Sequence, residues 1–143
     1  MEKIIIGSDH AGYNLKNRII NYIKSKGIEV YDAGTYNTES CDYPIIAKNV
    51  ANKIAQKEYE RGILICGTGI GMSMAANKIK GIRAAVVSDT CSAKMSRLHN
   101  NSNILCMGER IVGEELAKDI TEIWLTTEFL GERHQRRIDM LED

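Results

Sequence analysis

The segment from Ile63 to Gly71 constrains the fold of this chain more than any other. An apolar run of strand type ends at Cys66, and three alternating glycines then lead into residues 72–78, which have the pattern of a helix. The segment therefore predicts a strand, a tight turn and a helix in direct succession. The thiol of Cys66 is expected at the turn.

The glycine turn has a predictable chemistry. Glycines let the backbone approach a ligand closely with its N–H groups pointing inward, and the first turn of the following helix adds unpaired donors and a positive dipole. Such a turn favours an anion, whether a phosphate or a transient enolate. The same positive field favours the thiolate form of a cysteine, so Cys66 is a candidate base beside an oxyanion site.

Strand-type and helix-type segments alternate along the rest of the chain. Strands are expected at residues 3–8, 28–31, 61–66, 83–87 and 104–107, with amphipathic segments between them. Alternation of this kind implies a parallel sheet that helices cover on both faces. The sequence therefore predicts an α/β fold, a three-layer α/β/α Rossmann-like domain with a five-stranded parallel sheet.

Reactive side chains follow several of these strands. In parallel sheets of this kind, ligands bind beyond the carboxyl ends of the strands. We therefore expect the reactive side chains, and His99 with them, to gather at one edge of the sheet. Thr90 is expected to cap the helix that ends near His99. The residues that follow the strands are Asp9, His10, Cys66 with its glycine turn, Asp89, Glu109 and Arg110.

The C-terminal segment, about residues 131–142, has the pattern of an extra helix with no strand left to cover. Arg133 and Arg137 are four residues apart and share one face of it. We expect this helix to pack on a second subunit and to present the two guanidiniums to a phosphate there, because Arg forks match phosphate oxygens. A homodimer is therefore predicted.

Composition limits the organisation and the partners of the chain. The 143 residues, 43% of them hydrophobic, suit one domain spanning 1–143, and no linker-like segment divides them. A formal net charge of zero, without a Lys/Arg stripe, argues against nucleic acid as a partner. The N-terminal apolar run is too short for a signal peptide, and no segment approaches the ~18 apolar residues of a membrane span. We expect a cytoplasmic protein without a membrane partner.

The cysteines do not suggest a metal or redox centre. No CxxC pair occurs, so neither a zinc site nor a redox dithiol is indicated. A cytosolic location also argues against disulfides. The four cysteines are Cys41, Cys66, Cys91 and Cys106.

Six motifs follow one another along the chain: Gly7-Ser8-Asp9-His10-Ala11-Gly12, Asp42-Tyr43-Pro44, Cys66-Gly67-Thr68-Gly69-Ile70-Gly71, Ala75-Ala76-Asn77-Lys78, Ser96-Arg97-Leu98-His99-Asn100 and Gly131-Glu132-Arg133-His134-Gln135-Arg136-Arg137. In this order they resemble the type B ribose-5-phosphate isomerases of the ribose/galactose isomerase family. The resemblance covers essentially the whole chain.

The resemblance implies an enzyme of the pentose phosphate pathway that interconverts ribose 5-phosphate and ribulose 5-phosphate. The reaction would need no metal or cofactor and would pass through a cis-enediolate. The enzyme would be a homodimer, possibly a tetramer, whose active sites draw on both subunits. One branch of the family uses a Glu just after the glycine loop as base, but Met72 stands there, which places this chain in the branch that uses Cys.

The resemblance also implies the roles of individual residues. Cys66 would move the proton between C1 and C2, and His99 with Asp9 would open the furanose ring. Thr68 would hold the enediolate together with the amides of the glycine loop. The remaining implied contacts are Gly67, Gly69 and Gly71 with the enediolate, Tyr43 and Asn100 with the sugar, and His10, Arg110, Arg133 and Arg137 with the phosphate.

Other functions fit parts of the sequence. A dinucleotide site would use Gly67, Gly69 and Asp89, but the third glycine comes one residue early and the loop follows the third strand instead of the first. A P-loop is excluded in its usual form, since no Gly-Lys-Ser/Thr follows. A hexose 6-phosphate isomerase of the same family, acting on allose or galactose 6-phosphate, and a non-catalytic sugar-phosphate-binding module remain as alternatives. If these residues have no functional role, Cys66 is a core residue and the histidines are structural.

Overall fold

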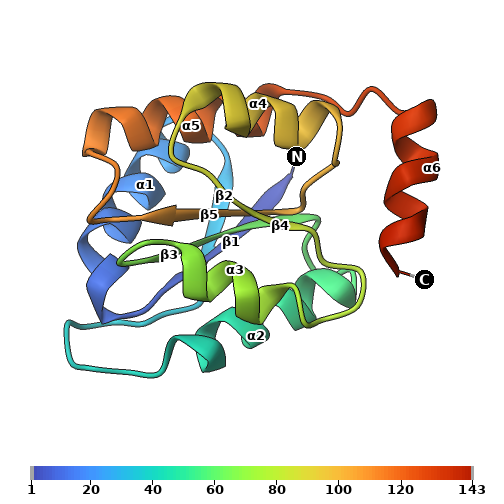
Figure 1. The fold of residues 1–143 in the computed structure, drawn as a ribbon. Coiled ribbons are helices and arrows are strands. Elements are labelled where there is room, and N and C mark those ends of the chain that lie inside the picture. Colours follow the sequence, from blue (N-terminus) through green and yellow to red (C-terminus); the bar gives the residue numbers. More distant parts are fainter. Residues whose placement is uncertain (1, 143) are drawn as a thin grey trace.

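The computed structural model describes residues 2–142 and contains the predicted parallel sheet (Figure 1). All neighbouring strands pair in parallel, in the order β2-β1-β3-β5-β4. The strand β3, which carries the glycine turn at its end, lies at the centre. The strands are β1 (Lys3–Ser8), β2 (Glu29–Asp32), β3 (Arg61–Cys66), β4 (Ala84–Val86) and β5 (Ile104–Gly108).

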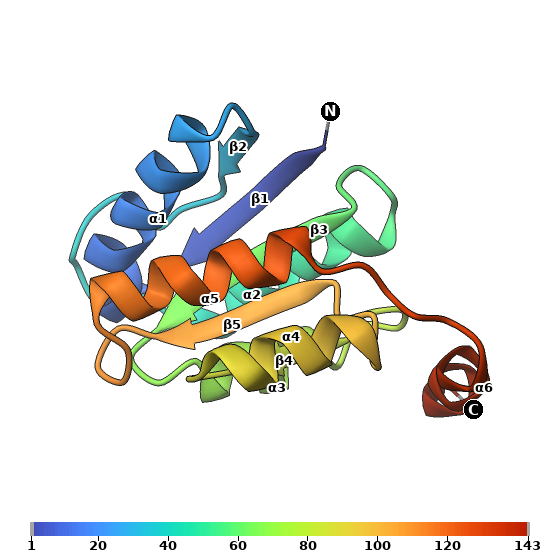
Figure 2. The ribbon, with the colours of Figure 1, turned by 90° about the horizontal axis from the view of Figure 1, so that it is seen from above.

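Helices cover both faces of the sheet, which confirms the three-layer α/β/α architecture. The helices α1, α4 and α5 lie on one face, and α2 and α3 lie on the other (Figures 1 and 2). The helices are α1 (Tyr13–Ser25), α2 (Tyr43–Ala55), α3 (Ile70–Ala76), α4 (Thr90–Leu98), α5 (Glu114–Thr126) and α6 (Arg133–Asp139), with short 3-10 turns η1 (His10–Gly12) and η2 (Met140–Glu142).

The central strands are apolar on both sides because both faces of the sheet are buried. Side chains alternate between faces along a strand, so Ile63 and Ile65 pack under α1 and α5 while Leu64 packs under α2 and α3. In β1, Ile4 and Ile5 divide between the same two clusters. The strand that positions Cys66 is therefore packed against helices on both faces.

Two helix boundaries differ from the sequence-based expectation. The cap of α4 is Asp89, whose Oδ1 accepts the N–H of Ser92 at 2.6 Å, and Thr90 is the first helical residue. The helix α3 begins at Ile70, inside the glycine turn, because Gly69 adopts the left-handed conformation at its N-cap. Only Gly67, Thr68 and Gly69 therefore separate the end of β3 from the start of α3.

The helix α6 stands apart from the other helices. It lies at the end of the sheet from which the strands start, since the arrowheads of β1 and β5 point away from it (Figures 1 and 2). Its described contacts agree with this position, because the N–H of Gly81, before β4, donates to Oε1 of Glu142 in η2 at 3.0 Å. Among residues 2–142, no helix is long and apolar enough to cross a membrane.

Candidate active site

Cys66 ends β3, and its side chain is held by the turn that follows. The Sγ atom accepts a hydrogen bond from the backbone N–H of Gly69 at 3.1 Å. Gly69 has φ +83°, a left-handed conformation that glycine adopts at little cost. Cys66 is 6% exposed, so little water competes for its sulfur. The glycine turn therefore fixes the sulfur of Cys66 with a backbone donor aimed at it.

The turn after β3 packs directly against the turn after β5. The N–H of Arg110 donates to the backbone oxygen of Gly67 at 3.0 Å. A Cβ on Gly108 would come within 2.5 Å of the backbone of Thr68, so this approach requires glycine. The guanidinium of Arg110 lies against Gly67, 3.5 Å from where a Cβ on that residue would stand. A cation is therefore fixed beside the glycine turn.

Asp9 and His10 follow β1 and lie next to this turn. Oδ1 of Asp9 accepts the N–H groups of Ala11 and Gly12 at 3.0 and 3.1 Å, which fixes the carboxylate. The Nδ1 atom of His10 accepts the N–H of Cys41 at 3.2 Å. Because a backbone N–H donates to Nδ1, the proton of the neutral ring is on Nε2. The resulting Nε2–H is a donor that suits a phosphate oxygen.

Tyr43, the first residue of α2, lies against the glycine turn at Gly71. A Cβ on Gly71 would lie 2.7 Å from the Tyr43 ring, so the glycine allows the ring to approach the turn. These residues line an open pocket of about 270 Å³, called the Cys66 cavity below. Its lining residues are Asp9, His10, Ala11, Tyr43, Cys66, Gly67, Thr68, Gly71 and Arg110.

Glu109 stabilises this edge of the sheet in a way that the sequence did not reveal. Its Oε1 accepts the N–H of Leu15, in the first turn of α1, at 2.7 Å. The carboxylate thus caps a helix that lies far away in the sequence, where negative charge is favourable. The contact ties the β5–α5 turn, which carries Arg110, to the segment that carries Asp9.

The structure does not bring His99 to the Cys66 cavity, and the expectation that it shares an edge with His10 is wrong. The helix α4 starts beyond the carboxyl end of β4 and returns toward the opposite edge, where His99 follows its last residue. There His99 borders a separate cavity of about 300 Å³, called the His99 cavity below. Its lining residues are His99, Asn100, His134, Arg137, Ile138 and Leu141.

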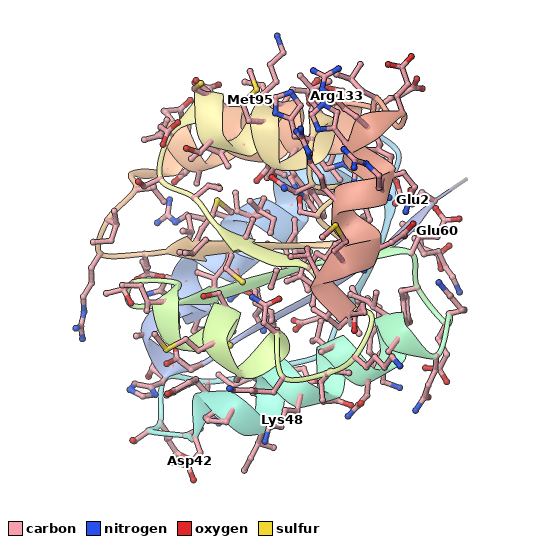
Figure 3. All side chains as sticks on the ribbon, turned by 45° about the vertical axis from the view of Figure 1, so that its right-hand side comes forward. Glu2, Asp42, Lys48, Glu60, Met95 and Arg133 are labelled. Atoms are coloured by element: carbon pink, nitrogen blue, oxygen red, sulfur yellow. The ribbon has the colours of Figure 1, made fainter. Side chains whose placement is uncertain are left out.

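Arg137 lines the His99 cavity, and Arg133 lies at the start of the same helix, near the end of α4 (Figure 3). The rings of His99 and His134 stack with centroids 4.3 Å apart and planes within 11°. His134 belongs to the C-terminal motif, and the sequence does not predict this contact, because nothing in the local sequence shows which neighbour its ring meets. His134 and Ile138 are the two buried residues of α6.

Asp89 joins neither cavity, because its carboxylate is engaged as the cap of α4. This removes the acidic residue that a dinucleotide site would have needed after the glycine turn. Within residues 2–142, no three His, Cys, Asp or Glu side chains are grouped so that they could hold a metal ion.

The fold and the site define a Rossmann-like α/β protein with a glycine turn at the carboxyl edge of its sheet. A sequence model of the Ribose/Galactose Isomerase family matches residues 4–141. The chain therefore belongs to the ribose/galactose isomerase family and is an isomerase, as its six motifs predicted.

Individual relatives agree with this assignment. Ribose-5-phosphate isomerase B of Escherichia coli strain K12 is 49% identical over 141 residues, 99% of this chain and 95% of the relative. A D-erythrulose-4-phosphate isomerase of Pectobacterium atrosepticum is 46% identical over 132 residues, 92% of this chain and 87% of the relative. The solved structure of Clostridium thermocellum ribose-5-phosphate isomerase B superposes with a TM-score of 0.97 at 53% identity, over 98% of this chain and 95% of that one.

Proposed function

We propose that this protein interconverts ribose 5-phosphate and ribulose 5-phosphate through a cis-enediolate, with Cys66 as the base and without a metal or cofactor. The observation that carries the proposal is the placement of the Cys66 sulfur, which accepts the Gly69 N–H and borders a cavity with Thr68 and the glycine turn. The names of the relatives support the substrate class.

The base step follows from this arrangement. The Cys66 thiolate removes the hydrogen on C2 of the open-chain aldose as a proton, and the C–H electron pair forms the C1–C2 double bond of an enediolate. A proton then passes from O2 to O1, the O2 electron pair forms the C2 carbonyl, and the electron pair of the C1–C2 double bond takes the proton back from the thiol at C1, which gives the ketose. Donors aimed at the developing oxyanion are worth roughly 3 to 4 kcal/mol each. Thr68 and the amides of Gly67 and Gly71 would supply them, whereas the N–H of Gly69 already donates to the sulfur of Cys66.

Ring opening requires residues that a single chain does not place beside Cys66. We propose that His99, acting with Asp9, moves the proton from the anomeric hydroxyl to the ring oxygen, and that Asn100 and Tyr43 line the sugar. Since His99 and Asn100 border the second cavity, they would come from another copy of the chain.

The proposed assembly is a homodimer in which the Cys66 cavity of one protomer meets the His99 cavity of its partner; pairs of such dimers would give a tetramer. In a two-fold dimer each such contact occurs twice, so both sites are completed together. Exposed apolar side chains of Ile70, Met74 and Val86 on α3 and β4 offer surface for the contact. The phosphate would be bound by His10, Arg110, Arg133 and Arg137.

Conversion of ribose 5-phosphate in the presence of EDTA tests the proposal. Wild-type protein should turn over, and Cys66→Ala should lose about 1000-fold or more in kcat, in line with the loss of a general base. Cys106→Ala is the matched control, because Cys106 is a buried cysteine on the adjacent strand that does not line the cavity. Appreciable turnover by Cys66→Ala would contradict the assignment of the base.

Substrate length is a separate choice within this proposal, because relatives act on sugars of different size. One relative bears the name of a tetrulose phosphate isomerase and the family name includes galactose. Comparing kcat/KM for erythrose 4-phosphate, ribose 5-phosphate, allose 6-phosphate and galactose 6-phosphate decides it. We expect ribose 5-phosphate to be best. Binding of ribose 5-phosphate without turnover of any of the four would favour a non-catalytic module.

A further inference from the structure

His134 is the buried polar residue of α6 that the proposed reaction does not use. It is 7% exposed, and its ring lies flat on that of His99. The two rings come from different elements, since His99 follows α4 and His134 is in the first turn of α6. The N–H of Leu130, just before α6, also donates to the backbone oxygen of Leu98 at 3.1 Å. The stack and this hydrogen bond therefore connect the end of α4 to the start of α6.

The Nε2 atom of His134 is buried without a hydrogen-bond partner among the described residues. Buried polar atoms are normally paired, because an unpaired one costs free energy. With no hydrogen bond at this atom, the notable contact of the His134 ring is its face-to-face stack on His99.

The surroundings of His134 disfavour its charged form. Burial lowers the pKa of His134, and the positive charges of His99, Arg133 and Arg137 lower it further, while Glu132 acts in the opposite direction. A neutral ring stacks on His99 whether or not His99 carries a proton, whereas two imidazolium rings at this separation would repel each other. His134 thus offers His99 a surface that tolerates both of its protonation states.

We propose that His134 is a positioning residue for ring opening, whose flat ring fixes the plane of the His99 imidazole. The inference rests on the proposed function, in which His99 opens the furanose.

Ring opening depends on the exact placement of His99. The anomeric O–H bond and the bond between C1 and the ring oxygen break, the C1 carbonyl forms, and one proton passes to the ring oxygen. Proton transfer requires heavy-atom distances of about 2.6 to 3.2 Å, so a ring that tilts away from either oxygen slows the step. The enediolate step at Cys66 does not use His99 and should be unaffected.

Two assays separate these steps. Conversion of ribose 5-phosphate, which is mainly cyclic, requires ring opening. Exchange of the C1 hydrogen of ribulose 5-phosphate with D2O, followed by NMR, requires only the base step, because this ketose has its C5 oxygen phosphorylated and stays open-chain. His99→Asn serves as the reference, since it should lose conversion and keep exchange.

The test compares His134→Ala with His134→Phe, which keeps a flat ring. We expect His134→Ala to lose about 10-fold or more of the conversion rate, as expected for a misplaced catalytic group, with exchange within about 3-fold of wild type. His134→Phe should recover conversion to within about 3-fold. Thermal unfolding of both variants checks that the fold is intact.

Three outcomes overturn the inference: His134→Ala converts ribose 5-phosphate normally, it loses conversion and exchange equally, or His134→Phe is as impaired as His134→Ala. Failure of the proposed function looks different. Wild-type protein would then show no exchange, or Cys66→Ala would retain it, and either result removes the ring-opening role along with the base.

Discussion

The sulfur of Cys66 lies 3.1 Å from the backbone nitrogen of Gly69 and accepts its N–H, with only Gly67 and Thr68 between the two residues. The donor is set by the left-handed conformation of Gly69, at φ +83°. The environment of the proposed base is therefore built into the backbone of the turn. Substitutions that disturb the backbone should impair catalysis even when every polar side chain remains.

Gly69→Ala tests this dependence. The new Cβ would stand 2.9 Å from the backbone of Met107 in a left-handed conformation that itself costs about 1 to 2 kcal/mol for a non-glycine residue. Gly81→Ala is the matched control, with φ +90° but no atom within 4 Å of the new Cβ. We expect Gly81→Ala to lose only the conformational cost in urea denaturation. Gly69→Ala should lose more stability and most of its turnover; equal behaviour of the two variants would contradict the close-packed turn.

Glu109→Ala should destabilise the protein by about 1 to 2 kcal/mol, because the N–H of Leu15 loses its carboxylate acceptor at the start of α1. Glu109→Gln keeps an acceptor oxygen and should lose less. Chemical denaturation of the two variants checks the order. A Gln variant as unstable as the Ala variant would show that the charge alone matters.

Arg137→Ala should raise KM for ribose 5-phosphate by about 10-fold or more, since a charge-assisted contact to phosphate is worth roughly 1.5 to 3 kcal/mol. Arg136→Ala provides the control, because Arg136 is exposed on the same helix and does not line the His99 cavity. Steady-state kinetics of both variants measure the difference. An unchanged KM for Arg137→Ala would remove the proposed phosphate contact.

The lowered pKa of His134 makes stability depend on pH in a defined direction. In the unfolded chain this histidine titrates near its ordinary pKa of 6.5, so below that pH the unfolded state binds more protons than the folded state. The folded protein is therefore favoured above pH 6.5 and loses stability as the pH falls below it.

Melting temperatures from pH 8 to pH 5 measure this effect. Wild-type protein should lose more on acidification than His134→Phe, which has no proton to bind at this site. Parallel curves for the two proteins would show that His134 does not contribute to the pH dependence of the melting temperature.

Features encoded by local pattern were predictable from the sequence. The apolar run ending at Cys66 and the glycines after it predicted the central strand and the turn, because the turn is a property of consecutive residues. The Cys66–Gly69 contact lies within that turn. The pairing of Glu109 with Leu15 was not predictable, because it joins segments that meet only in the folded sheet.

The prediction for His99 was wrong about the edge of the sheet at which the residue lies, and the reason is different. The sequence already implied that α4 follows a strand and must run back across the sheet, so a residue at its end belongs at the opposite edge from Cys66. The rule that ligands bind beyond the carboxyl ends of the strands applies to residues that follow strands, such as Asp9 and His10, and does not extend to His99, which follows a helix. The stack with His134 depends on where α6 begins relative to the end of α4, which no local pattern determines.

The most direct test is to mix Cys66→Ala with His99→Asn, each inactive alone, by refolding or co-expressing the two chains. In a two-fold dimer with shared sites, a mixed dimer regains one complete site that combines Cys66 of one chain with His99 of the other. An equal mixture should therefore recover about a quarter of wild-type activity. Recovery of that size would support both residue assignments and the shared site. A mixture that stays inactive after subunit exchange has been demonstrated would contradict them.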